Sequence, residues 1–90
     1  MEHAELHRLY DSRGFAKSNL KDYEGAIGDF TKAIEYNPEN PRVYYHRAES
    51  LAADGRFSDA NSDLVRALRR DPTHPGALRL MQKLRDQGLV

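Results

Sequence analysis

The sequence predicts an all-α fold, a solenoid built from antiparallel helix pairs. Residues 7–40 align with residues 41–74 at a period of 34 residues, with seven identities. A fixed period of roughly 20 to 50 residues is typical of stacked structural units. Apolar or small residues recur every three or four positions in each copy, which is the period of a helix. Proline and glycine separate these stretches, so five helices are predicted.

The first copy, residues 7–40, is predicted to form two helices. The inward-facing stripe of the first helix is expected to be Leu6, Leu9, Tyr10, Gly14, Lys17 and Leu20. The chain turns at "KDY", and Asp22 is placed to cap the second helix. The stripe of that helix is Tyr23, Ala26, Ile27, Phe30, Ala33 and Ile34. The stretch "NPENP" ends it, because a residue before proline avoids the helical region.

The second copy, residues 41–74, repeats this plan. Asn40 is the expected cap of its first helix, and Pro41 suits the first helical turn. The two predicted stripes are Val43, Tyr44, Ala48, Leu51 and Ala52, then Phe57, Ala60, Leu64, Ala67 and Leu68. Residues 75–88 are predicted to form a capping helix with Ala77, Leu78, Met81 and Leu84 facing inward.

Small residues recur at equivalent places in the two copies. Gly14 corresponds to Ala48, Ala26 to Ala60, and Ala33 to Ala67. We expect them where paired helices approach closely, since a larger side chain there would force the helices apart at a cost of roughly 1–3 kcal/mol.

Length and composition favour one small domain over residues 1–90. Net charge is zero, with 8 acidic and 5 basic residues in 1–40 against 6 and 9 in 41–90. This imbalance is too weak to indicate a nucleic-acid-binding protein. The chain has no cysteine, no apolar run of the ~20 residues that a membrane helix needs, and no signal-like N-terminus. We expect a cytoplasmic location and no membrane partner.

The repeat resembles the tetratricopeptide repeat, a 34-residue helix–turn–helix unit. The first copy matches its pattern with Tyr10, Gly14, Tyr23, Ala26, Phe30, Ala33 and Pro38, and the second with Tyr44, Ala48, Phe57, Ala60, Leu64, Ala67 and Pro72. The resemblance implies a right-handed superhelical stack and a protein-interaction module, either an adaptor or scaffold or a co-chaperone-like protein. Three residues depart from the pattern. Lys21 replaces a turn glycine, and Arg13 and Arg47 stand where leucine is common, with their charges expected to point outward.

The first helices of such units line a concave groove that holds a peptide or protein segment. By period, the residues expected on it are Arg8, Asp11, Ser12, Phe15, Asn19, Arg42, Tyr45, His46, Glu49, Ala53, Arg79 and Lys83. Phe15 and Tyr45 stand off the core stripe, and exposed aromatics beside arginine are favoured at binding hot spots. Their alternative role is packing between neighbouring helices. Arg42, Arg79 and Lys83 suit an acidic partner segment, the alternative being a solvated charged face.

Some family members hold the acidic tail of heat-shock chaperones with a clamp of lysine, asparagine and arginine. The matching positions here are Asp11, Phe15, His46, Gly76 and Leu80, none of which fits. We therefore predict no chaperone-tail binding of that type.

Enzymatic chemistry and cofactors find little support in the sequence. No serine has a histidine in a plausible relay, and no glycine-rich phosphate loop is present. His3 and His7 are spaced to touch one metal, but no further ligand is evident, so we expect two exposed histidines and no metal site.

Two functions remain open. One is an adaptor whose groove binds an extended or helical segment. The other is a self-assembly unit that associates through its terminal helices, because no preceding repeat covers the apolar edge near Leu6 and Leu9.

Overall fold

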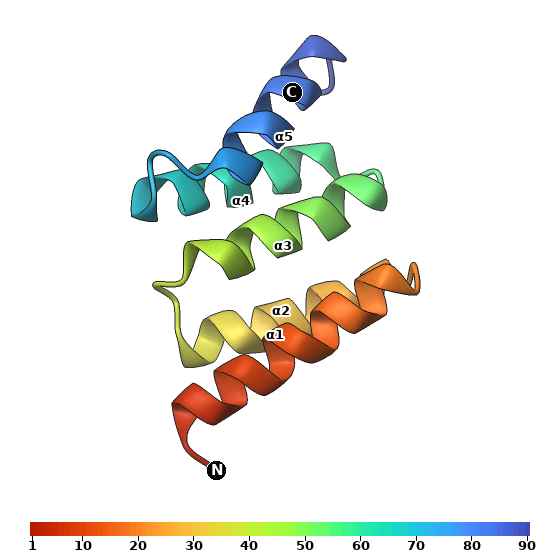
Figure 1. Ribbon diagram of the computed structural model, residues 1–90. Coiled ribbons are helices and arrows are strands. Elements are labelled where there is room, and N and C mark those ends of the chain that lie inside the picture. The colour runs from red at the N-terminus through yellow and green to blue at the C-terminus, as the bar shows by residue number, and fades with distance from the viewer.

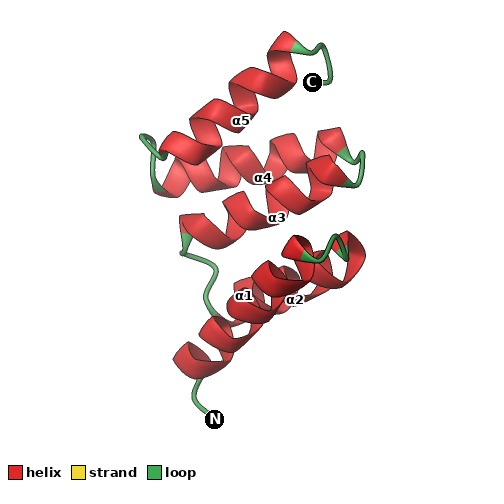
Figure 2. Ribbon diagram, turned by 45° about the vertical axis from the view of Figure 1, so that its right-hand side comes forward, coloured by secondary structure: helices red, strands yellow, loops and turns green.

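The computed structural model describes residues 1–90 and consists of five α-helices without strands, which confirms the predicted fold class. The helices are α1 (His3–Asn19), α2 (Tyr23–Tyr36), α3 (Pro41–Ala53), α4 (Phe57–Arg70) and α5 (Pro75–Asp86). They form two antiparallel pairs, α1 with α2 and α3 with α4, and α5 crosses the second pair (Figures 1 and 2). The molecule is elongated, 43 × 27 × 17 Å, with its termini at opposite ends (Figure 1). None of the helices combines the length and apolarity that crossing a bilayer requires.

The predicted helix caps are present. The Asp22 side chain accepts a hydrogen bond from the Gly25 N–H at 3.0 Å, and the Asn40 side chain accepts one from the Arg42 N–H at 3.1 Å. Pro41 occupies the first turn of α3. These side chains satisfy N–H groups that have no partner inside their own helices.

Lys21 shows what replaces the usual turn glycine. It has a left-handed backbone with φ 64°, and Gly55 at the equivalent place in the second copy has φ 81°. Both turns close in the same way, with Asp22 N–H bonded to the Lys17 carbonyl and Arg56 N–H to the Leu51 carbonyl. The same turn is therefore made in both copies, and Lys21 bears the ~1–2 kcal/mol penalty of a side chain in this conformation.

The capping helix α5 is two residues shorter than predicted. It ends at Asp86, because Gly88 takes a left-handed conformation with φ 69° and the Leu89 N–H bonds back to the Leu84 carbonyl. This is the common glycine stop at a helix C-terminus.

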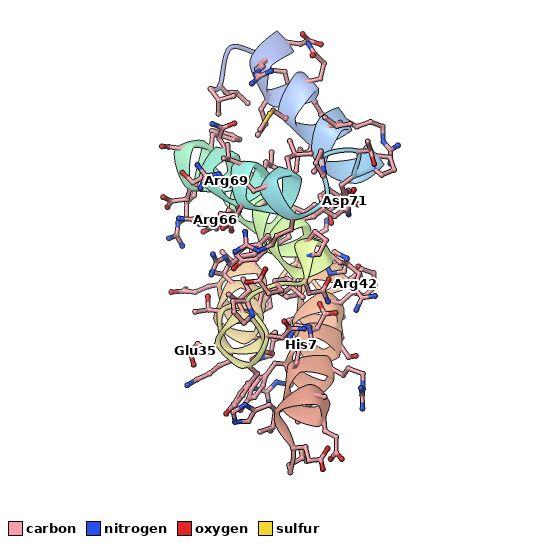
Figure 3. All side chains as sticks on the ribbon, turned by 90° about the vertical axis from the view of Figure 1, so that its left-hand side faces the viewer. His7, Glu35, Arg42, Arg66, Arg69 and Asp71 are labelled. Carbon is pink, nitrogen blue, oxygen red and sulfur yellow. The ribbon has the colours of Figure 1, made fainter.

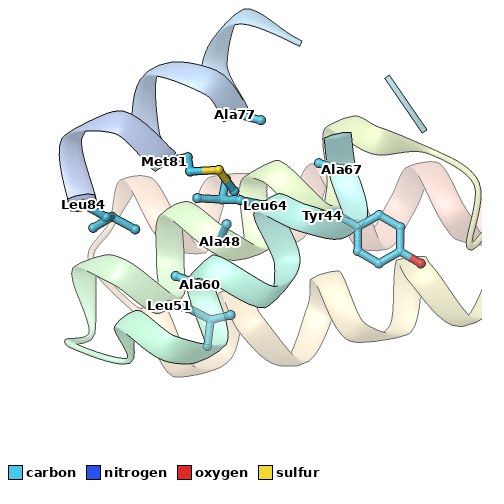
Figure 4. Packing of buried hydrophobic residues seen from close by; sticks show 9 residues of the cluster. All are labelled: Tyr44, Ala48, Leu51, Ala60, Leu64, Ala67, Ala77, Met81 and Leu84. Atoms are coloured by element: carbon cyan, nitrogen blue, oxygen red, sulfur yellow. The ribbon is translucent and has the colours of Figure 1, made fainter. Parts of the chain in front are cut away.

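The core is built around the small residues that repeat. Ala26, Ala33, Ala48, Ala60 and Ala67 are all fully buried, as expected for close helix approach. The larger of two buried clusters joins the second pair to the capping helix (Figure 4). Its members are Tyr44, Ala48, Leu51, Ala60, Leu64, Ala67, Ala77, Met81 and Leu84. The smaller cluster consists of Ala26, Phe30, Ala33 and Val43, so it extends from the first pair onto α3.

Three leucines that were predicted to face inward are instead exposed. Leu9 is 45% exposed, Leu20 81% and Leu78 46%. For Leu9 and Leu78 the prediction was wrong because α1 and α5 are each covered on fewer sides than the inner helices, and for Leu20 because it lies beyond the last residue of α1. The buried residues of α1 are His7, Asp11 and Gly14, so hydrophobicity alone misplaced its inner face.

The expectation that Arg13 and Arg47 carry their charges outward was wrong for Arg47, whose side chain is 18% exposed, whereas that of Arg13 is 52% exposed. Each arginine donates two hydrogen bonds to an aspartate 16 residues further along the chain. Arg13 binds Asp29 at 2.8 and 2.8 Å, and Arg47 binds Asp63 at 2.6 and 2.7 Å. Asp29 and Asp63 are buried. The hydrogen bonds from Arg13 hold the pKa of Asp29 below its ordinary value, despite burial. Each pair thus ties the two helices of its own repeat together.

A further set of hydrogen bonds docks the second pair on the first. Arg47 also donates to the Thr31 hydroxyl at 3.2 Å, so one side chain links α2, α3 and α4. The Tyr44 hydroxyl and the Arg70 guanidinium both donate to the Pro38 carbonyl, at 2.9 and 2.8 Å. Side chains of one repeat therefore satisfy polar groups of the other.

His7 takes part in this docking and is not the exposed histidine that was expected. It is 5% exposed and lies between α1 and α2 (Figure 3). Its Nδ1–H donates to the Ala33 carbonyl at 2.7 Å, because a carbonyl can only accept. Its Nε2 accepts from the Asn40 amide at 3.1 Å, while the Asn40 oxygen caps α3. Both ring nitrogens are used inside the fold.

The close packing of Gly14 against the Phe30 ring can be tested by substitution. A Cβ at this position would lie 2.7 Å from the Phe30 ring, whereas the second copy combines Ala48 with the smaller Leu64 at the equivalent places. Gly14→Ala should destabilise the chain by about 1–2 kcal/mol, because overpacking outweighs the gain in helix propensity. In a Phe30→Leu background the same change should stabilise by up to ~1 kcal/mol. Urea unfolding of the four variants measures both effects. If Gly14→Ala changed the free energy of unfolding in the same direction in both backgrounds, overpacking against Phe30 would be contradicted.

Candidate binding groove

Three hollows follow one another along the face formed by α1, α3 and α5. The first, of about 440 Å³, is lined by Asp11, Ser12, Phe15, Arg42 and His46. The second, of about 410 Å³, is lined by Phe15, Ser18, Asn19, Tyr23, Phe30, His46, Glu49 and Ala53. The third, of about 280 Å³, is lined by Glu49, Ala52, Ala53, Phe57, Leu80, Lys83, Leu84 and Gln87. Neighbouring hollows share two residues each, so together they form one continuous depression, called the groove below.

The first hollow is organised by a buried carboxylate. Asp11 is 7% exposed and accepts hydrogen bonds from Arg42 at 3.1 Å and from His46 Nδ1 at 3.2 Å. Burial raises the pKa of Asp11, but the hydrogen bond and charge of His46, together with Arg42, outweigh it and lower that pKa. Asp11 therefore serves to hold Arg42 and His46 of the next repeat, and its charge is already compensated.

Tyr45, which was expected in the groove, lines none of the three hollows and is not a free aromatic. Its ring packs on Gly76, where a Cβ would come within 2.6 Å of the Tyr45 Cζ. Its hydroxyl donates to Glu49 at 2.9 Å. Burial, and next the hydrogen bond to Glu49, raise the pKa of Tyr45 from 10.0 to about 12. Glu49 consequently has one of its oxygens occupied within the chain.

Phe15 is the most exposed aromatic ring at the groove. It is 49% exposed and stands between the first and second hollows, with its ring centroid 5.3 Å from that of His46. The fully buried Phe30 lines the second hollow together with Phe15, as do Asn19 and Glu49. Such a hollow suits one large apolar side chain of a partner.

Charges of both signs remain without an ion pair at or near the groove, because Glu49 lines two of the hollows and is bonded only to the neutral Tyr45 hydroxyl. Arg8, Arg79 and Lys83 are exposed and form no ion pair within the chain. Lys83 lines the third hollow, while Arg8 and Arg79 stand outside the three hollows. Arg42 is also exposed and lies on the opposite side of the molecule from Glu35, Arg66 and Arg69 (Figure 3).

Several groove residues were not expected from the sequence. Tyr23 and Phe30 were assigned to the core, yet both line the second hollow, and Ser18, Phe57, Leu80 and Gln87 were not assigned a groove role. Gln87 was within reach of sequence reasoning, because the 34-residue period places it in line with Asn19 and Ala53. Tyr23 and Phe57 are the first residues of α2 and α4, so they reach the hollows from the turns before these helices. The periodicity of the first helix of each pair gives no information about these positions.

Neither the groove nor the rest of the chain brings together three or more His, Asp or Glu side chains in a way that would hold a metal ion. His7 is committed to Ala33 and Asn40, so it is not available to act with His3.

Comparison with known proteins gives consistent matches to one family. The family model described as tetratricopeptide repeat matches residues 20–84. The chain is 34% identical over 71 residues to "Protein STIP1 homolog" of Dictyostelium discoideum, and 30% identical over 74 residues to "Hsp70/Hsp90 co-chaperone CNS1" of Saccharomyces cerevisiae. It is 38% identical over 56 residues to "TPR repeat-containing thioredoxin TTL4" of Arabidopsis thaliana. These alignments cover 79%, 81% and 62% of the chain but only 13%, 19% and 8% of the relatives.

The environment of Tyr45 predicts a distinct alkaline titration. One of the five tyrosines should titrate near pH 12 in the ultraviolet absorbance, and Tyr45→Phe should remove that step. Glu49→Gln should lower its midpoint only partly, because burial is the larger cause. Since the folded chain holds this proton more tightly, Tyr45 should contribute stability that is lost as pH rises from about 10 to about 12. A Tyr45 midpoint near 10 would contradict the packing described.

Proposed function

Because the chain belongs to the tetratricopeptide repeat family, we propose that it is a protein-interaction module whose groove holds a segment of another protein. The observation that carries the proposal is the continuity of the three hollows, which share Phe15, His46, Glu49 and Ala53 as common walls. A continuous depression across three helices matches an extended segment better than it matches a compact small molecule.

The groove chemistry favours a segment that is acidic with one large apolar residue. Arg8, Arg79 and Lys83 have no acidic partner in the chain, whereas Asp11 is compensated by Arg42 and His46. Complementary charge supports specificity and association rate, and the second hollow supplies a site where an apolar side chain can anchor. We therefore propose that the apolar residue enters the second hollow and that the acidic residues lie toward the exposed cations.

The relatives named as co-chaperones do not settle the partner of this chain. The positions of the chaperone-tail clamp hold Asp11, Phe15, His46, Gly76 and Leu80. Asp11 is a buried carboxylate already bound to two neighbours, so it would not attract an acidic tail in the way that a lysine does. We propose an adaptor or scaffold role that does not use this clamp.

A binding role is also proposed in preference to a catalytic one. The thioredoxin named among the relatives is matched over 8% of its length, so its activity is not transferred to this chain. The groove offers hydrogen-bonding and apolar contacts, and its one buried carboxylate is engaged in holding two helices together.

Affinity capture from cell extract tests the proposal. The wild-type chain should retain a partner that a Phe15→Ala/Arg79→Glu variant loses, because the variant removes the anchor ring and reverses an uncompensated charge. The matched control is Leu20→Ala/Arg69→Glu, which alters an exposed apolar residue and an exposed arginine away from the groove. All three chains must show the same circular dichroism and melting temperature.

Two results would contradict the proposal: retention of the partner by the groove variant, or its loss by the control variant alone. A chaperone-tail peptide serves as the negative probe in a direct titration. It should show no saturable binding at concentrations up to about 100 μM, and a micromolar dissociation constant would overturn the proposed absence of the clamp.

A further inference from the structure

His46 has two ring nitrogens with different surroundings. Its Nδ1 lies 3.2 Å from one oxygen of Asp11, whose other oxygen accepts a hydrogen bond from Arg42. Its Nε2 has no hydrogen-bond partner within the chain. This nitrogen is nevertheless open to solvent, because the one buried side-chain nitrogen or oxygen without a partner is Asn61 Oδ1. His46 lines the first and second hollows, so a bound segment can reach the free nitrogen.

Asp11 determines which nitrogen carries the proton when His46 is neutral. Burial raises the pKa of Asp11, but the hydrogen bond and charge of His46, together with Arg42, lower it below its ordinary value and keep the carboxyl ionised. A carboxylate only accepts hydrogen bonds, so Nδ1 must be the donor. Neutral His46 therefore has an unused lone pair at Nε2.

Given the groove function proposed above, on which this rests, we propose that His46 Nε2 accepts a hydrogen bond from a main-chain N–H of the bound segment, beside its large apolar residue. An extended segment gives up hydrogen bonds to water as it enters the groove, and each buried N–H needs an acceptor there. His46 is placed next to the apolar anchor, because its ring centroid lies 5.3 Å from that of Phe15, which lines the same two hollows.

The charged acceptors of the first two hollows are less suitable. Both oxygens of Asp11 are bonded to side chains of α3, and one oxygen of Glu49 is bonded to the Tyr45 hydroxyl. The imidazole nitrogen is uncharged, so unlike Glu49 it does not repel the acidic residues proposed for the segment. An acidic segment can therefore bond its main chain to His46 without bringing two negative charges together.

Protonation of His46 would reverse the preference at this point of the groove. An imidazolium donates from both nitrogens, so Nε2–H would suit a carboxylate and no longer a main-chain N–H. The titratable and charged groups around His46 are Asp11 on α1, Tyr23 on α2, Arg42, Tyr45 and Glu49 on α3, and, near Tyr45, His74 and Arg79. His46→Phe keeps all of these groups and an aromatic ring at the same position, so it isolates the role of the imidazole.

Nitrogen-15 NMR of the imidazole rings tests the tautomer in the free chain. At about pH 9, where histidine is ordinarily neutral, His46 should have a protonated Nδ1 and an unprotonated Nε2. Asp11→Asn should populate both tautomers, because an amide can accept from Nδ1–H or donate to an unprotonated Nδ1. A wild-type His46 that is protonated mainly on Nε2 would overturn the proposal.

Two matched probes test the acceptor itself. N-acetyl-leucine methylamide offers a large apolar side chain next to a neutral N–H, and N-acetyl-leucine has a carboxylate in place of that N–H. On acidification from about pH 9 to about pH 5.5, the wild-type chain should bind the methylamide about threefold less tightly and the carboxylate about threefold more tightly. The shifts of the Phe15 and His46 signals measure both affinities, and circular dichroism at each pH verifies the fold.

His46→Phe is the decisive comparison. At about pH 9 it should bind the methylamide about threefold less tightly than the wild-type chain does, and the opposite pH trends of the two probes should disappear. Equal methylamide affinity of the two chains, the same pH trends in both, or no saturable binding of the methylamide to the wild-type chain would each overturn the proposal. Capture by the Phe15→Ala/Arg79→Glu variant tests the groove function separately, so either conclusion can fail without the other.

Discussion

The structure depends on a carboxylate that is buried inside each helix pair and bound by an arginine of the opposite helix. In the second pair Asp63 is 1% exposed, and Arg47 holds both of its oxygens. An uncompensated buried carboxylate would cost several kcal/mol, and this arginine compensates it together with a second cation, Arg66 for Asp63 and Lys17 for Asp29. Arg47 then reaches the Thr31 hydroxyl of the preceding pair, so the same side chain also sets how the pairs are stacked. Other docking bonds between the pairs run from Tyr44 and Arg70 to Pro38, and from Arg42 and His46 to Asp11.

Much of the fold was predictable from the sequence, because repeated backbone geometry leaves repeated residues. The period, the caps at Asp22 and Asn40, and the alanines at close approach follow from local rules. The Arg–Asp pairs were detectable in principle, since Arg13, Arg47, Asp29 and Asp63 are all identities of the 34-residue alignment. They were missed because an arginine on an apolar stripe was interpreted one residue at a time, without its partner 16 positions away.

What could not be predicted is which face of α1 is buried. That helix buries His7, Asp11 and Gly14, and each is explained only by a residue far along the chain: Asn40 for His7, Arg42 and His46 for Asp11, and Phe30 for Gly14.

The same limitation applies to the groove. The period places Phe15, His46 and Glu49 on one side of the molecule, but it does not reveal that Asp11 and Tyr45 are engaged within the chain. Those internal contacts decide which groove charges are left for a partner.

The central claim is that the face built by α1, α3 and α5 is the one that binds another protein, and amide NMR mapping tests it most directly. A segment of a captured partner would be titrated into the isotope-labelled chain. The account predicts that the largest shifts fall on residues around the hollows, at Phe15, Asn19, His46, Ala53 and Lys83. Shifts confined to the opposite side, at Glu35, Arg66 and Arg69, would contradict it.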